Sequence, residues 1–246
     1  MVMHEDLVRE FHEIVKDVAG YMQHHRTMGM ETISARDAAE MNTLLETMTG
    51  DPVSKTSWSP ENAVTLDDIR RELGDCTRCN LSQSRKNIVF GKGNPRAALV
   101  LVGEGPGREE DLAGEPFVGE AGQLLTRILQ AINLSRDEVY ITNVVKCRPP
   151  KNRDPQPIEI ETCSPFLKNQ LQAIRPRVIC ALGKYAAQTL LETSEPISRL
   201  RGKVYERQSL RIVPTFHPAS LLRNPQWKRD VWQDMQLIQQ LLEERH

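Results

Sequence analysis

The chain has 246 residues, of which 39% are hydrophobic and 26% charged, and its formal net charge is −1. This composition is typical of a globular protein with enough residues for one sizeable core. No apolar run reaches the length that crosses a bilayer, and the charged first residues lack the apolar stretch of a secretory signal. We therefore expect a cytoplasmic protein without a membrane partner.

The charge is unevenly divided along the chain. Residues 1–64 carry 5 Lys and Arg against 11 Asp and Glu, which leaves 27 against 22 for residues 65–246. The longer part is therefore mildly basic. Such a balance permits a nucleic acid partner but does not by itself establish one.

The acidic first part has the pattern of an accessory segment. Apolar residues recur there at helical spacing, and Ser34 begins a second helical pattern before a stretch rich in Gly, Pro, Ser and Thr. We predict a helical N-terminal extension over residues 1–50, a linker over 51–64 and a catalytic domain over 65–246. The extension carries no expected chemistry and is a candidate surface for a protein partner.

From Thr65 onward, apolar runs typical of strands alternate with helical patterns. A short helix begins at Thr65, whose side chain is a good N-cap. Continuous apolar strands separated by helices favour an α/β fold with a parallel sheet covered on both faces. The predicted strands cover residues 96–103, 138–145, 177–183 and 210–216, and the predicted helices cover 65–73, 121–132, 158–174, 184–193 and 228–244.

Unusual residues stand where the predicted strands end. The sequence GEGPG begins at the end of the first strand, Asn143 lies near the end of the second, and His217 with Pro218 follows the fourth. Open parallel sheets bind ligands outside the carboxyl ends of their strands, so we expect these features to converge on one site. The glycine loop lacks both the GK[ST] ending of a P-loop and the spacing of a dinucleotide fingerprint.

Four cysteines form two spaced groups. Cys76 and Cys79 make a CxxC pair, and Cys147 and Cys163 stand on either side of a proline-rich loop. Cytosolic thiols stay reduced, so four of them suit a tetrahedral metal or a four-iron cluster better than disulfides. Ligand softness alone leaves zinc and iron equally open. Cys180 lies inside an apolar strand and is expected to be a small buried residue.

Four ordered segments resemble the family 4 uracil-DNA glycosylases, the iron–sulfur branch of that superfamily: GEGPGREEDLAGEPFVGEAGQLL, VYITNVVKCRPPKNRDPQP, CSPFLKNQLQAIRPRVICALG and HPASLLRNP. The resemblance implies a three-layer α/β/α fold around a four-stranded parallel sheet and excision of uracil from single- or double-stranded DNA. It also implies a [4Fe-4S] cluster on Cys76, Cys79, Cys147 and Cys163, and so favours the cluster over zinc.

The resemblance assigns roles to individual residues. Phe117 would stack on the flipped base, although its spacing alone is typical of a core residue. Asn143 would read the N3–H and O4 edge of uracil, where the alternative is an amide that bonds local backbone. His217 would donate a hydrogen bond to uracil O2 as a neutral ring. Gly103 and Gly105 would let the backbone close around the base.

The carboxylates receive less distinct roles. Glu104 would position the attacking water or balance the cationic sugar. Gly105 stands where a better-known branch of the superfamily carries a catalytic aspartate, so orientation and electrostatics would carry more of the catalysis. Glu110 would lie near uracil C5 and obstruct the methyl group of thymine. We expect Asp111, Glu109 and Glu115 to be solvated.

The segment after His217 is a candidate DNA contact. Leu221 or Leu222 would enter the duplex as a wedge, and Arg223 would bind phosphate. The rival interpretations are a noncatalytic iron–sulfur protein of the same fold that binds DNA, and a zinc-containing homologue. KCRPPKNRDP contains no histidine, which counts against the branch with an inserted catalytic histidine.

We expect a monomer.

Overall fold

Four parallel strands form the centre of the structure, a computed structural model that describes residues 64–207 and 210–244. The predicted extension over 1–50 and all of the predicted linker except Val64 lie outside the described residues. The domain boundary therefore stays a prediction. Within the described part, no helix is long and apolar enough to cross a membrane.

The sheet has six strands in the order β1-β3-β2-β4-β6-β5. The four predicted strands are all present and pair in parallel. Two short edge strands, which the sequence analysis missed, pair antiparallel to β3 and β6; strands of two and three residues are too short to show a period. The strands are β1 (Lys92–Gly93), β2 (Leu99–Gly103), β3 (Tyr140–Asn143), β4 (Val178–Leu182), β5 (Tyr205–Arg207) and β6 (Leu210–Thr215).

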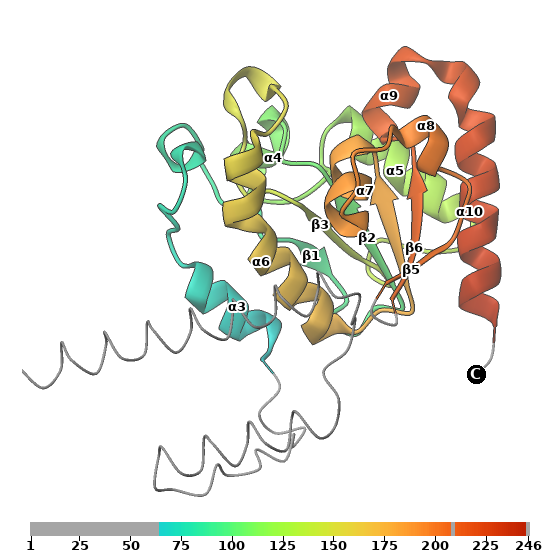
Figure 1. The fold of residues 1–246 in the computed structure, drawn as a ribbon, viewed down its shortest axis with the longest axis horizontal. Coiled ribbons are helices and arrows are strands. Elements are labelled where there is room, and N and C mark those ends of the chain that lie inside the picture. The colour runs from blue at the N-terminus through green and yellow to red at the C-terminus, as the bar shows by residue number, and fades with distance from the viewer. Residues whose placement is uncertain (1–63, 208–209, 245–246) are drawn as a thin grey trace, which may run out of the picture. The chain divides into compact units, whose positions relative to one another are not determined.

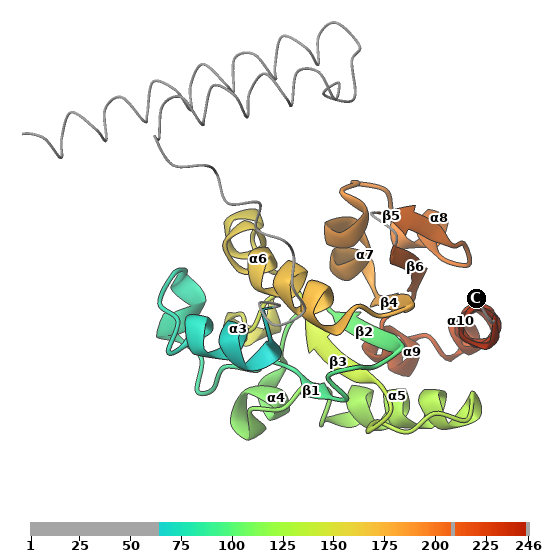
Figure 2. The same ribbon diagram turned by 90° about the horizontal axis from the view of Figure 1, so that it is seen from below.

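Helices cover both faces of this sheet, which confirms the three-layer arrangement (Figures 1 and 2). On one face lie α5 (Glu120–Ala131), α9 (Pro218–Arg223) and α10 (Lys228–Glu243). On the other face lie α6 (Pro157–Ile174) and α7 (Lys184–Leu191). The other helices of residues 64–207 and 210–244 are α3 (Leu66–Leu73), α4 (Arg108–Ala113) and α8 (Ile197–Leu200), with single 3-10 turns at Asn80–Gln83, Pro150–Asn152 and Pro225–Trp227.

The alternation of side chains along β2 creates two cores. Leu99 and Leu101 pack toward α5 and α10, whereas Val100 and Val102 pack toward α6 and α7. All five β2 residues are buried, as expected for a central strand with a helix layer on each side. The buried Cys180 on β4 belongs to the first core, as its place in an apolar strand predicts.

A buried ion pair fixes the end of β6. The Asp234 carboxylate on α10 is fully buried and accepts hydrogen bonds from Arg201 Nη2 at 2.6 Å and from the Thr215 hydroxyl at 2.6 Å. Thr215 is the last residue of β6, two residues before His217. The pair therefore anchors the strand end that leads into the candidate site.

Replacing Asp234 with Ala should lower the free energy of unfolding by about 3–5 kcal/mol, because it leaves the Arg201 charge and the buried Thr215 hydroxyl without their partner. Urea denaturation measures this loss. Asp230→Ala is the matched control, since Asp230 lies 3.7 Å from the same arginine but is 40% exposed, and its loss should stay below about 1 kcal/mol. Equal losses would contradict the assignment.

Candidate active site

The ends of β2 and β3 are aligned so that Gly103 stands opposite Asn143. A Cβ atom on Gly103 would lie 2.3 Å from Asn143 Oδ1 and 2.7 Å from Phe117 Cζ. Only glycine allows the amide and the aromatic ring to approach the strand end this closely. The structure thus brings together three predicted site residues.

The Asn143 side chain is buried and has no hydrogen bond within the described part of the chain. It is 1% exposed, and both Oδ1 and Nδ2 lack partners there. Because unpaired buried amides are rare and costly, the unused donor and acceptor are best explained by a ligand. The alternative, an amide that bonds local backbone, is not what the structure contains.

Lys146, which the sequence analysis did not single out, holds the backbone next to this amide. Its ammonium donates to the Asn143 carbonyl at 2.7 Å, the Thr142 hydroxyl at 2.7 Å and Gln170 Oε1 at 2.6 Å. The side chain is fully buried, and burial lowers the pKa of Lys146 to about 8. The sequence feature that could have identified Lys146 is the presence of a lysine within the apolar run that follows β3.

Phe117 lies beside His217, with ring centroids 5.4 Å apart and planes 30° apart. Its backbone has a φ of 53°, the left-handed region that non-glycine residues seldom occupy. A Cβ on Gly122 would lie 1.8 Å from the Phe117 carbonyl oxygen, so the first turn of α5 packs directly on this strained residue. Such strain persists only where the surroundings enforce it, as at functional sites.

Glu110 secures the same loop. Its carboxylate accepts backbone N–H groups from Val118 and Gly119, each at 2.9 Å, and from Gly107 at 3.1 Å. Three such bonds fix both the carboxylate and the segment that carries Phe117. This supporting role was not foreseen, and the predicted obstruction of a thymine methyl group stays a prediction.

His217 caps α9 and is held in one tautomer. Its Nδ1 accepts the Ala219 backbone N–H at 3.1 Å, so the proton of the neutral ring resides on Nε2. Burial, with the nearby Arg223 charge as a second cause, lowers the pKa of His217 to about 4. The ring is therefore a neutral hydrogen-bond donor at physiological pH.

Glu104 follows Gly103 and is half-buried. Burial and the neighbouring Asp154 carboxylate raise the pKa of Glu104 to about 7, against the opposing effect of Lys184. The Tyr185 hydroxyl donates to Asp154 Oδ2 at 2.6 Å, so this second carboxylate is itself fixed. Sequence reasoning missed Asp154, Lys184 and Tyr185, which come from a loop and a helix start without any motif of their own.

One expectation about a neighbouring residue is wrong, and one of two alternatives is narrowed. Asp111 is not solvated: it is 2% exposed, and its Oδ1 accepts the backbone N–H groups of Lys86 at 2.8 Å and Asn87 at 3.3 Å. Leu221 is 1% exposed and packs in the core with the α5 leucines, so it is not available as a wedge. Leu222 is half-buried and Arg223 exposed.

Gly105 packs against Val145, whose Cγ2 would lie 2.6 Å from an added Cβ.

The four predicted cysteine ligands come from three segments and are free thiols. Burial, with smaller effects of Cys163 and Cys79, raises the pKa of Cys147 to about 12, and burial with Cys79 and Cys76 raises the pKa of Cys163. The four side chains are therefore electrostatic neighbours. Among the described residues, no three His, Cys, Asp or Glu side chains form a group that could hold a metal ion.

Donor groups surround these sulfurs. Arg78 Nη1 lies 3.4 Å from Cys76 Sγ, Arg85 Nη1 lies 3.5 Å from Cys147 Sγ, and the Lys146 backbone N–H donates to Cys163 Sγ at 3.3 Å. N–H groups directed at thiolates stabilise them and tune the centre they hold.

The arrangement as a whole suits one class of ligand. Phe117 offers an aromatic face, Asn143 offers an adjacent donor and acceptor, and His217 offers a neutral N–H. These groups can bind a planar heterocycle and stabilise negative charge that develops on it.

Comparison with known proteins agrees with this chemistry. The family model of the uracil DNA glycosylase superfamily matches residues 90–236. The type-4 uracil-DNA glycosylase of Archaeoglobus fulgidus is 49% identical over 185 residues, which are 72% of this chain and 93% of that protein. The type-4 enzyme of Saccharolobus solfataricus is 43% identical, over 72% of this chain and 86% of its own. The type-5 uracil-DNA glycosylase of Pyrobaculum aerophilum is 31% identical, over 63% and 83%.

Proposed function

The chain belongs to the uracil DNA glycosylase superfamily and is a uracil-DNA glycosylase, a hydrolase of N-glycosyl bonds that acts in DNA repair, and we propose how its residues perform this reaction. Uracil is flipped out of the DNA and stacks on Phe117. Asn143 Nδ2 donates to uracil O4, and Oδ1 accepts from N3–H. The observation that carries this assignment is the buried Asn143 amide with neither atom paired.

The bond that breaks joins N1 of uracil to C1′ of the sugar, and its electron pair stays with the base. The resulting negative charge spreads to O2, where the His217 Nε2–H donates a hydrogen bond. A neutral donor suits this role because it stabilises the anion without a full proton transfer. Water adds to C1′, and Glu104 accepts its proton or balances the sugar cation. The products are free uracil and an abasic site.

Base selection follows from the same amide. Cytosine presents a donor at position 4 and an acceptor at N3, the reverse of uracil, so both Asn143 atoms would face a like partner. A site that leaves buried polar groups unpaired rejects the wrong base strongly. The Lys146 hydrogen bond to the backbone carbonyl of Asn143 fixes the main chain from which this amide projects.

We also propose that Cys76, Cys79, Cys147 and Cys163 hold a [4Fe-4S] cluster. Four thiols with N–H donors on three of them fit a thiolate-bound cluster. When bound, the cluster would cross-link three chain segments beside Lys146. The alternative is a zinc ion on the same cysteines, and metal analysis of the purified protein distinguishes zinc from iron.

The remaining proposals concern partners. Arg223, exposed beside His217, would bind a DNA phosphate, and Leu222 would take the wedge position that the buried Leu221 leaves. A protein partner for the N-terminal extension, a monomeric state and a cytoplasmic location stay proposals from the sequence. A noncatalytic homologue of this fold would have no use for the unpaired Asn143 amide.

Replacing Asn143 or His217 with Ala should lower the rate of uracil release by about 10²–10³, the usual effect of losing one donor to a developing anion. Conversion of uracil-containing single- and double-stranded oligonucleotides to abasic sites measures this rate. Asn94→Ala, in a turn at the amino end of β2, is the matched control and should keep full activity. Wild-type rates in the site variants would show that the roles are misassigned.

The pH dependence should reveal Glu104. The ionised carboxylate is the active form, and its pKa is about 7, so kcat/KM should fall as the pH is lowered through 7. His217 stays neutral down to about pH 4 and adds no loss above that value. Glu104→Gln should be slow and should lack the loss near pH 7. An unchanged profile in this variant would assign the titration to another group.

Purified protein should be brown and contain iron and sulfide. Cys147→Ser should lose most of the iron, since one of four ligands is gone, whereas Cys180→Ala should retain it because Cys180 lies in β4 away from the four. Metal analysis and visible absorption measure both variants. Colourless protein with one zinc per chain would overturn the cluster and leave the site residues untouched.

A further inference from the structure

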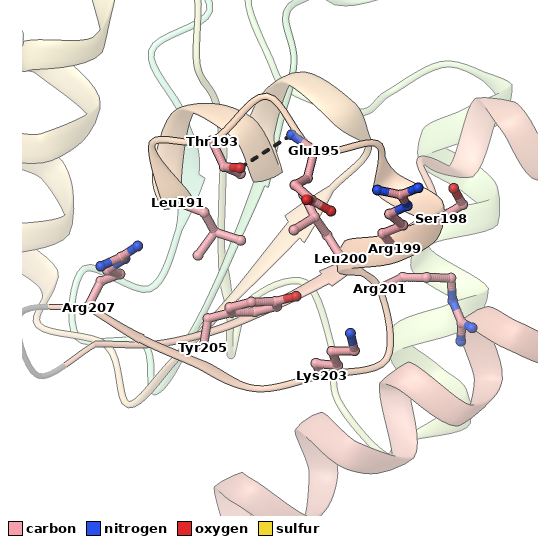
Figure 3. A pocket seen from close by; sticks show the side chains of 10 residues that line it. All are labelled: Leu191, Thr193, Glu195, Ser198, Arg199, Leu200, Arg201, Lys203, Tyr205 and Arg207. Carbon is pink, nitrogen blue, oxygen red and sulfur yellow. Dashed lines mark hydrogen bonds between the residues drawn. The ribbon is translucent and has the colours of Figure 1, made fainter.

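A cavity of about 530 Å³ lies at the edge of the sheet, apart from the candidate active site. It is formed by the end of α7, the loop that follows, α8 and the edge strand β5 (Figure 3). Its volume falls within the range of pockets that bind small ligands. None of the predicted catalytic or base-binding residues lines it.

The lining is strongly basic. Arg199, Lys203 and Arg207 are exposed, and none of these side chains forms an ion pair within the described part of the chain. Arg201, the fourth cation, is engaged by Asp234. Glu195 is the one carboxylate of the lining. Lysines and arginines on an edge strand also deter aggregation, but that role requires no cavity.

An aromatic ring lies between the charges. Tyr205 and Arg207 stand at alternate positions of β5 and so share one face, and Lys203 precedes the strand by two residues. Figure 3 shows the Tyr205 ring between the Lys203 and Arg207 side chains. Tyr205 is half-buried, and Leu191 and Leu200 add apolar surface to the lining. A flat aromatic surface flanked by cations is how proteins bind unpaired nucleotides, with bases stacked and phosphates neutralised.

The cavity also has a defined position relative to the site. Tyr205 pairs with Ile212, and Thr215 at the end of β6 lies three positions further along the strand, a distance of about 10 Å. Arg201 lies over the Phe216 ring, 5.7 Å from its centroid, and Phe216 precedes His217. A DNA strand that presents a base to His217 can therefore reach this edge.

We propose that this pocket binds an unpaired nucleotide of the substrate strand, a few positions from the excised base. Tyr205 stacks on the base, and Arg199, Lys203 and Arg207 contact its phosphates. The proposal rests on the proposed function, because its ligand is the DNA strand on which the enzyme acts. It predicts a preference for longer and unpaired substrates that the base site alone does not provide.

The test measures binding of a uracil-free single-stranded 20-mer as a function of salt. The triple variant Arg199→Gln, Lys203→Gln and Arg207→Gln should bind more weakly, and its slope of log K against log salt should fall by about 2, because each phosphate contact contributes about 0.7. A control with the same loss of charge replaces Arg70, Arg71 and Arg96, which are exposed on α3 and in the turn before β2, and should keep the wild-type slope.

Activity separates this pocket from the catalytic site. The triple variant should keep the wild-type kcat on a uracil pentanucleotide and show a raised KM on the 20-mer substrate. Tyr205→Leu should lose about tenfold or more in affinity for the 20-mer while leaving the salt slope unchanged, since stacking carries no charge.

Three results would overturn the proposal. The first is an equal slope of log K against log salt in the triple and control variants. The second is an equal loss of kcat on the short and long substrates. The third is binding of free thymidine monophosphate that depends on the three cations while binding of the 20-mer does not. The last would make the pocket a site for free nucleotides. If wild-type protein released no uracil but the binding differences persisted, the proposed function would fail and the pocket would stand.

Discussion

The site depends on the absence of one side chain at the end of β2. Gly103 lies directly opposite Asn143, and the space where its Cβ would be is occupied by the Asn143 amide and the Phe117 ring. Any other residue would push the amide and the ring away from the strand end. The parallel register thus positions both the surface on which a base can stack and the group that can read its edge.

Keeping the Asn143 amide unpaired costs stability, on the order of 1–3 kcal/mol for a buried polar group. The surrounding structure fixes the backbone that carries the amide and the backbone that carries the ring. Lys146 fixes the Asn143 carbonyl through a buried network with Gln170, and Glu110 fixes the loop of Phe117 through three backbone bonds. Rigid support around an unsatisfied group is what a preorganised binding site requires.

The sequence was most informative where a pattern repeats or a motif is long. Four apolar strands and their helices were predicted because burial on both faces leaves continuous apolar runs. The edge strands were missed because strands of two or three residues are too short to show an alternating pattern. Lys146 and Asp154 were missed because their roles depend on contacts between distant segments of the chain. Leu221 shows a different limit: a leucine beside a histidine motif does not reveal which way a helix turns it, and α9 turns it into the core.

Burial has opposite effects on the pKa values of Glu104 and His217, and both effects favour the neutral form. It raises the pKa of Glu104 to about 7 and lowers that of His217 to about 4. In the proposed mechanism, poor solvation thus keeps the pKa of the Glu104 carboxyl near neutral pH and leaves the His217 donor without a charge. A charged His217 would attract the leaving anion more strongly, but it would also have to be desolvated in the resting enzyme. The neutral ring avoids that cost, and its N–H becomes effective only as negative charge develops on the base.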